Sequence, residues 1–118
     1  MGLPDVRAIV KNPADLSRAQ ELEFLVDSGA IYSVVPRSVL LDLGIQPDDV
    51  ESFSLADMTP IRREIGEAAF TFRGRTRTSP VMFGEEGDAT LLGVMTLEFL
   101  GLMIDPVKQE LRKMQLRV

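Results

Sequence analysis

Apolar and polar residues alternate in the first two long stretches of the chain, 5–11 and 19–27. A period of two is typical of strands that bury one face. The segment between them contains Asn12-Pro13, and because this pair favours a turn, we predict a hairpin here. A shorter apolar run predicts a third strand at 30–35.

The remaining apolar stretches are also short, and turn-forming residues separate them. Pro60, Gly74 and Pro106 mark three of the turns, since Pro and Gly favour chain reversal. A fourth, polar turn occupies 85–88. The predicted strands occupy 50–56, 61–72, 75–84, 89–93, 102–105 and 109–116.

Two segments predict short helices instead. The first begins at Pro36 and ends at Gly44, and the second begins at Val94 and ends before Gly101, which places Pro and Gly where helices favour them. Three leucines of the first helix are expected to face the core: Leu40, Leu41 and Leu43. Many short strands with two short helices predict an all-β, barrel-like fold, in one domain over residues 1–118.

Composition limits the available chemistry. The chain has 118 residues and contains neither Cys nor His, which excludes disulfides, thiolate nucleophiles and Ser-His catalysis. Carboxylates or Lys must therefore carry any proton transfer. We expect no metal and no cofactor, because the acidic residues Glu85, Glu86 and Asp88 do not have the spacing of a calcium-binding EF-hand.

Charge and hydropathy limit the partners. The net charge is −5 at pH 7, which argues against nucleic-acid binding. No apolar run approaches the roughly 20 residues of a membrane span, and no signal-peptide pattern opens the sequence. We therefore expect a cytoplasmic protein that binds neither nucleic acid nor membrane.

One carboxylate interrupts an apolar stretch. In "LEFLVDSGAIYSVVP", residues 22–36, an apolar run leads into Asp27 and resumes after Ser28 and Gly29. An ionised Asp is almost never fully buried without a partner, because desolvation of a lone charge is costly. Asp27 therefore either forms a turn at a strand end or is held there for chemistry, and Asp-Ser-Gly alone is also a common turn sequence.

Two segments carry a family resemblance. "FLVDSGA" (24–30) resembles the first signature of retroviral-type, or retropepsin-like, aspartic proteases, and "TLLGVMTLEFLGLMIDP" (90–106) resembles their second. The predicted hairpin around 57–60 lies where these proteases carry their flap. The resemblance covers nearly the whole chain and is closest to single-domain bacterial and archaeal members. Ser28 departs from the commoner Thr, and the flap turn lacks a Gly-rich tip.

The resemblance implies a closed β-barrel of the acid-protease type and a homodimeric endopeptidase for peptide or protein substrates. Asp27 is its expected catalytic residue. One group must take a proton from water while another gives one to the carbonyl oxygen, and two carboxylates about 3 Å apart share a proton. The sequence has one Asp-Ser-Gly, so the second Asp27 must come from a second copy of the chain.

Further site residues follow from the same resemblance. The expected support of the active site consists of Ser28, Gly29, Ala30, Leu91, Leu92 and Gly93. The residues expected in the flap or against the substrate are Ala56, Asp57, Met58, Thr59, Ile31 and Tyr32. The cleft should favour apolar side chains because its expected walls are apolar. These walls are Ile31, Tyr32, Val34, Leu91 and Leu92.

Two other functions remain open from the sequence. The same barrel could serve as a non-catalytic peptide-binding or dimerisation module, which needs no pair of carboxylates. An unrelated β-barrel, such as a small-ligand carrier, would leave both signatures as coincidence. The approach of two Asp27 carboxyl groups to hydrogen-bond distance separates the enzyme from the binding module.

Overall fold

A computed structural model describes residues 5–115 of the chain. Within them the chain forms nine strands and two short helices. The strands are β1 (Asp5–Asn12), β2 (Asp15–Val26), β3 (Ser33–Pro36), β4 (Asp49–Ser54), β5 (Pro60–Phe72), β6 (Arg75–Gly84), β7 (Leu91–Leu92), β8 (Leu102–Asp105) and β9 (Glu110–Lys113). The helices are α1 (Arg37–Asp42) and α2 (Val94–Phe99). The predicted all-β class with short helices is confirmed.

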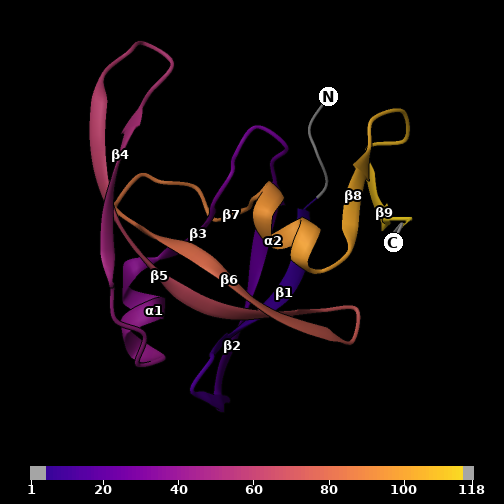
Figure 1. The fold of residues 1–118 in the computed structure, drawn as a ribbon, viewed down its shortest axis with the longest axis horizontal. Coiled ribbons are helices and arrows are strands. Elements are labelled where there is room, and N and C mark those ends of the chain that lie inside the picture. Colours follow the sequence, from indigo (N-terminus) through magenta and orange to yellow (C-terminus); the bar gives the residue numbers. More distant parts are fainter. Residues whose placement is uncertain (1–4, 116–118) are drawn as a thin grey trace.

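Seven strands form one sheet in the order β1-β2-β7-β3-β6-β5-β4 (Figure 1). β1 also pairs with β5, where residues 9–11 lie opposite residues 69–71. This extra pairing links six strands edge to edge in a ring, and β4 lies outside it. β8 and β9 form a separate antiparallel pair.

Aromatic side chains fill the core. Phe24, Phe70 and Phe83 are fully buried, and the rings of Phe24 and Phe70 pack edge to face with centroids 6.1 Å apart. Burial of each such side chain stabilises the fold by about 1.5–3 kcal/mol. The alternation predicted for β2 is present, since Phe24 and Val26 are buried while Leu25 between them is exposed.

Parallel pairing brings distant segments together beside the end of β2. β2 runs parallel to β7, with Val26 opposite Leu92, and β3 runs parallel to β6. β7 also meets β3, where Leu91 lies opposite Val34. Asp27, the residue after β2, therefore lies beside the strand that leads into α2.

The strand predicted at 30–35 begins only at Ser33. The carbonyl oxygens of Ala30 and Ile31 accept hydrogen bonds from the first two N–H groups of α2, at 2.8 and 3.1 Å. These N–H groups have no partner inside their own helix. The segment thus serves the start of a helix and not a strand ladder.

Both helices have six residues, and no helix within residues 5–115 is long and apolar enough to span a membrane. In α1, Leu40 is fully buried and Leu43 just beyond it is nearly so, as predicted. The prediction that Leu41 faces the core is wrong, because Leu41 is 40% exposed. Successive helix positions differ by about 100°, so neighbouring residues cannot share the narrow buried face of so short a helix.

Other strand boundaries also differ from the prediction, among them the end of the strand predicted at 50–56, which stops at Ser54. β2 begins at Asp15, so that the turn before it is shorter than its polar sequence suggests. The strand predicted at 89–93 is reduced to Leu91–Leu92. The last predicted strand, 109–116, corresponds to β9 at Glu110–Lys113, and residue 116 lies outside the described residues.

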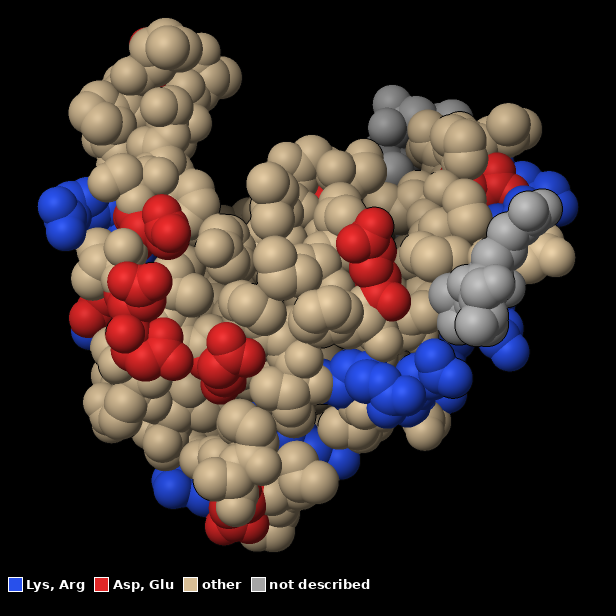
Figure 2. Space-filling view, in the orientation of Figure 1, with Lys and Arg blue, Asp and Glu red and all other residues tan. Residues whose placement is uncertain are grey.

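A hairpin projects from the rest of the molecule. Residues 49–54 of β4 pair with residues 60–65 of β5, and we call residues 49–65 the arm. Residues 54–60 at its end are all exposed. Figure 2 shows the arm standing away from the body, with a hollow beside it. This hairpin contains the turn predicted around 57–60.

Candidate active site

Backbone hydrogen bonds hold Asp27 at the end of β2. Its N–H donates to the carbonyl oxygen of Leu92 at 3.1 Å, which extends the β2–β7 pairing by one residue. Its carbonyl oxygen accepts from the N–H of Ala30 at 3.2 Å, and its Oδ1 accepts from the N–H of Gly29 at 2.8 Å. The half-buried carboxylate therefore forms the local turn expected of Asp, with one oxygen fixed.

Ser28 and Gly29 are exposed beside this carboxylate. A Cβ on Gly29 would lie 3.2 Å from Oδ1 of Asp27, so a larger residue would crowd the carboxylate. Ser28 lines a small cavity of about 180 Å³ together with residues of α2 and β8, among them Glu98 and Met103. The resemblance to retropepsin-like proteases also implies a hydrogen bond of the Ser28 hydroxyl group across a dimer, which stays a prediction.

Gly93 lets the chain pass under the loop that follows Asp27. A Cβ at this position would lie 2.5 Å from the carbonyl carbon and oxygen of Tyr32 and 2.8 Å from the carbonyl oxygen of Ile31. Backbone atoms cannot yield cheaply at such distances. The close approach allows α2, which starts directly after Gly93, to donate its first hydrogen bonds to the loop.

Three buried hydroxyl groups form a chain behind the site. Ser33 Oγ accepts from the N–H of Gly93 at 3.0 Å and lies 2.5 Å from Thr96 Oγ1. Thr96 Oγ1 lies 2.8 Å from Ser79 Oγ. Sequence reasoning missed these residues, although Ser33 and Thr96 each lie between apolar neighbours in a predicted strand or helix. The chain ties β3, α2 and β6 together beneath the loop that carries Asp27.

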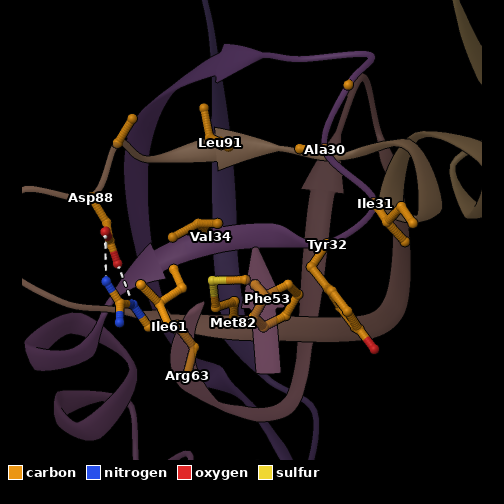
Figure 3. Close-up of a pocket in the computed structure, with 12 residues that line it drawn as sticks. Ala30, Ile31, Tyr32, Val34, Phe53, Ile61, Arg63, Met82, Asp88 and Leu91 are labelled. Carbon is orange, nitrogen blue, oxygen red and sulfur yellow. Dashed lines mark hydrogen bonds and ion pairs between the residues drawn. The ribbon is translucent and has the colours of Figure 1, made fainter. Parts of the chain in front are cut away.

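A pocket of about 350 Å³ opens between the body and the arm (Figure 3). The body supplies residues of the Asp27 loop and of the strands behind it, and the arm supplies Phe53, Ile61 and Arg63. Tyr32 and Phe53 bridge the two sides, with ring centroids 5.8 Å apart in edge-to-face contact. The lining residues are Gly29, Ala30, Ile31, Tyr32, Val34, Phe53, Ile61, Arg63, Met82, Asp88, Ala89 and Leu91.

Most of the predicted cleft wall lines this pocket. Its members there are Ile31, Tyr32, Val34 and Leu91. The prediction that Leu92 lines the cleft is wrong, because Leu92 is fully buried in the core. Adjacent residues of a strand point to opposite faces, so Leu91 and Leu92 cannot both face the pocket. Leu92 instead supports the site through the carbonyl oxygen that holds Asp27.

Asp27 and the four expected flap residues lie outside the pocket lining. Asp27 is two residues before Gly29, which does line it. The flap residues Ala56, Asp57, Met58 and Thr59 form the end of the arm. There the N–H of Thr59 donates to Asp57 Oδ1 at 3.0 Å. Hydrogen bonding by the Thr59 side chain, and then by this N–H group, lowers the pKa of Asp57. Met58 is 77% exposed and adopts a φ of 69°.

An ion pair closes one end of the pocket. Arg63 Nε lies 2.7 Å from Asp88 Oδ2 and Arg63 Nη2 lies 3.0 Å from Asp88 Oδ1, a bidentate arrangement (Figure 3). Hydrogen bonding to Arg63 holds the pKa of Asp88 below its usual range. Sequence reasoning missed this pair, since Asp88 reads as part of a solvated turn and Arg63 as one of many charged strand residues.

Comparison with known proteins bears on the fold. No protein-family model and no curated protein matches the sequence. Among solved structures, the fold is similar to that of the EIAV protease complexed with the inhibitor HBY-793, at 16% identity and a TM-score of 0.63, over 84% of this chain and 88% of that one. It is also similar to the solution structure of the Simian Foamy Virus (mac) protease, at 21% identity and a TM-score of 0.58, over 82% and 94%. The fold expected from the two sequence signatures is confirmed.

Proposed function

From this retropepsin-like fold, we propose that the chain is an aspartic endopeptidase that acts as a homodimer. The position of Asp27 carries the proposal. An exposed Asp-Ser-Gly loop presents one half-buried carboxylate at the end of an apolar strand. Its backbone is tied on both sides, to Leu92 and to Ala30. Such anchoring is what a catalytic carboxylate needs to keep its geometry.

Two copies of Asp27 would supply the acid and the base. When two carboxylates lie about 3 Å apart, they cannot both ionise and share one proton. The ionised member takes a proton from a water molecule, which attacks the peptide carbonyl carbon. The protonated member gives its proton to the carbonyl oxygen. Oδ1 of each Asp27 already accepts from Gly29, so Oδ2 is the oxygen assigned to the shared proton and the water.

One chain brings only one such carboxylate, because the sequence contains a single Asp-Ser-Gly. A two-fold axis beside Asp27 supplies the second without any further sequence. The predicted partner is therefore a second copy of the chain. The exposed Ser28 lies next to that axis and is the residue expected to contact its counterpart.

The hollow between arm and body suits an extended peptide. A peptide laid there pairs its backbone with protein backbone and places alternate side chains in pockets. Leu55 and Met58 at the end of the arm are exposed apolar residues, available to cover such a peptide. The flap assignment of residues 56–59 belongs to this proposal.

A specific observation also favours the binding module as a second candidate. The pocket is complete within one chain, and Asp27 is not among the residues that line it. This pocket would be sufficient for a protein that binds an apolar side chain of a peptide without cleaving the peptide. Catalysis, by contrast, requires Asp27 from two chains.

The substitution Asp27→Asn separates the two candidates. It keeps the shape of the side chain but cannot cycle a proton, so cleavage of an apolar-centred peptide library should be lost from about pH 4 to pH 8. Asp42→Asn, at an exposed carboxylate in α1, is the matched control and should cleave like the parent. Cleavage that survives Asp27→Asn would show that Asp27 is not catalytic.

A mixing experiment tests the homodimer. Excess Asp27→Asn chain, added to a fixed amount of parent chain, should draw the parent into mixed dimers that hold one carboxylate. Activity should then fall towards zero, and sedimentation at micromolar concentration should show a two-chain species. If the activity did not change with the excess of Asp27→Asn chain, one chain would be sufficient for cleavage, which contradicts the proposal.

A further inference from the structure

We propose that the Arg63–Asp88 ion pair sets the charge selectivity of the pocket, so that it accepts an uncharged apolar side chain of a peptide and rejects charged ones. The inference rests on the proposed function only in taking a peptide as the ligand. It assigns a role to two residues that lie outside the catalytic loop.

The size and walls of the pocket define what fits. A volume of about 350 Å³ is at the low end for ligand sites, so the pocket can hold one large side chain but not a whole peptide. Its walls are mainly aliphatic and aromatic, and include Tyr32, Val34 and Leu91 of the body and Phe53 of the arm (Figure 3). Apolar surface of the ligand gains free energy on entering such a site.

The two charged residues in the lining satisfy each other. Nε and Nη2 of Arg63 donate to Asp88, and Nη1 donates to the carbonyl oxygen of Arg62. Oδ2 of Asp88 also accepts from the N–H of Glu85 at 2.8 Å. Each guanidinium nitrogen and both carboxylate oxygens thus have a protein partner, and because the two opposite charges compensate each other, the pair presents no net charge to a ligand.

A charged side chain would therefore lose its hydration in the pocket without a compensating partner. That cost is large for an unpaired charge. An apolar side chain has no such cost. The pocket would thus discriminate against a charged side chain because it lacks an oppositely charged group, and not because it makes an additional contact with an apolar one.

The pair should persist over most of the pH range of the cleavage assay described above. Its side chains are only 17% and 25% exposed, so salt screens them less than a surface pair. Hydrogen bonding to Arg63 lowers the pKa of Asp88, which keeps this carboxylate ionised in mildly acidic solution. Charge selectivity should therefore change little between neutral and mildly acidic pH.

The chain contains its own reporter for this pocket. It has one Tyr and no Trp, and Tyr32 lines the pocket. Tyrosine fluorescence therefore reports occupancy directly. The titrations use the Asp27→Asn chain, in which the proposed cleavage cannot occur. They therefore test selectivity by binding alone, whereas the proposed catalysis is tested by the cleavage assays of the parent chain.

The test titrates this chain with three extended peptides that lack Tyr and Trp and differ in one central residue, Leu, Glu or Lys. The Leu peptide should bind about tenfold tighter or more than the other two. Asp88→Asn leaves Arg63 unpaired and should improve binding of the Glu peptide about tenfold. Arg63→Met leaves Asp88 unpaired and should do the same for the Lys peptide.

The charge-swapped chain, Arg63→Asp combined with Asp88→Arg, should restore the preference for Leu. It keeps the inference testable if a single variant fails to fold, which thermal melting reveals. Equal binding of the three peptides to the parent pocket would overturn the inference. The inference would also be overturned if the fluorescence of Tyr32 did not change when the Leu peptide is added. The same holds if Asp88→Asn left the ratio of the dissociation constants of the Glu and Leu peptides unchanged.

Discussion

Thr96 is a fully buried polar residue, and its hydroxyl group bridges those of Ser33 and Ser79. All three side chains are buried. A buried polar group that loses its partner costs about 1–3 kcal/mol. Because Ser33 in turn holds the N–H of Gly93, the network links the stability of the core to the loop that carries Asp27.

Thr96→Val should lower the free energy of unfolding by about 1–3 kcal/mol, measured by urea denaturation. The reason is that Ser33 and Ser79 both lose a hydrogen-bond partner while the shape of the side chain is kept. Thr96→Ser is the control, because it keeps the hydroxyl group and removes only a methyl group. If Thr96→Val were as stable as the parent while Thr96→Ser were weakened, the methyl group and not the hydroxyl would matter.

At this scale the sequence identified residues whose signals are local. Asp27 was apparent because a carboxylate follows an apolar strand directly, and Leu91 because it lies in a recognisable signature. Arg63 and Asp88 gave no such signal, since 24 residues separate them and only the folded chain joins them. Leu92 was misplaced because the sequence shows a strand but not which of its faces meets the pocket.

The end of the arm has little tertiary support. Residues 54–60 are exposed. Hydrogen bonds of the turn join residues within it: the N–H of Leu55 donates to the carbonyl oxygen of Thr59 at 2.9 Å, and the N–H of Met58 donates to that of Leu55 at 2.8 Å. Segments with few buried contacts open at low free energy. The end of the arm is therefore expected to move more than β2, whose Phe24 and Val26 are fully buried.

Amide hydrogen exchange should be faster at residues 56–61 than at residues 22–27, and it should slow when a peptide-like inhibitor binds. Binding in the hollow places the arm against a ligand and reduces its opening. Mass spectrometry of the exchanged chain, with and without inhibitor, measures both effects. Protection in the free protein equal to that of β2 would mean that this segment is not a lid.

Elements were predicted best where Pro or Gly punctuates the chain. The turn at Arg73-Gly74 joins β5 and β6 as expected, and both residues have positive φ. The apolar residues of segment 30–32 predict a strand, which the structure does not contain there. The carbonyl groups of Ala30 and Ile31 instead accept hydrogen bonds from α2, which is distant in sequence. A local sequence pattern cannot predict such a long-range interaction.

The molecule as a whole should respond to acid through a few carboxylates. Asp88 and Asp105 have lowered pKa values, the first from hydrogen bonding to Arg63 and the second from the N–H groups of Lys108 and Val107 and from Arg112. A lowered folded pKa adds stability that is complete above the unfolded value of about 3.9 and is lost as pH falls through the folded value. Burial raises the pKa of Glu67, which has the opposite effect: its contribution is lost as pH rises.

The free energy of unfolding of the parent chain should therefore fall steeply only below about pH 4, with little loss from these groups between pH 7 and pH 5. Urea denaturation at a series of pH values measures this curve. Asp105→Asn should be less stable at neutral pH and should show a shallower acid limb, whereas Asp42→Asn should follow the parent. An Asp105→Asn curve that stays parallel to that of the parent would remove Asp105 from the acid response.

The β2–β7 pairing also governs when the site comes into existence during folding. β1, β2, β4, β5 and β6 can form hairpins between neighbours as the chain emerges from the ribosome. The loop at Asp27 must wait for Leu92 and the start of α2, because they supply the bonds that hold it. Non-local and parallel pairings are slow to form. A nascent chain thus carries Asp27 in an unassembled loop until Leu92 and the start of α2 have emerged and folded, and the cleavage proposed above requires these later residues to be in place first.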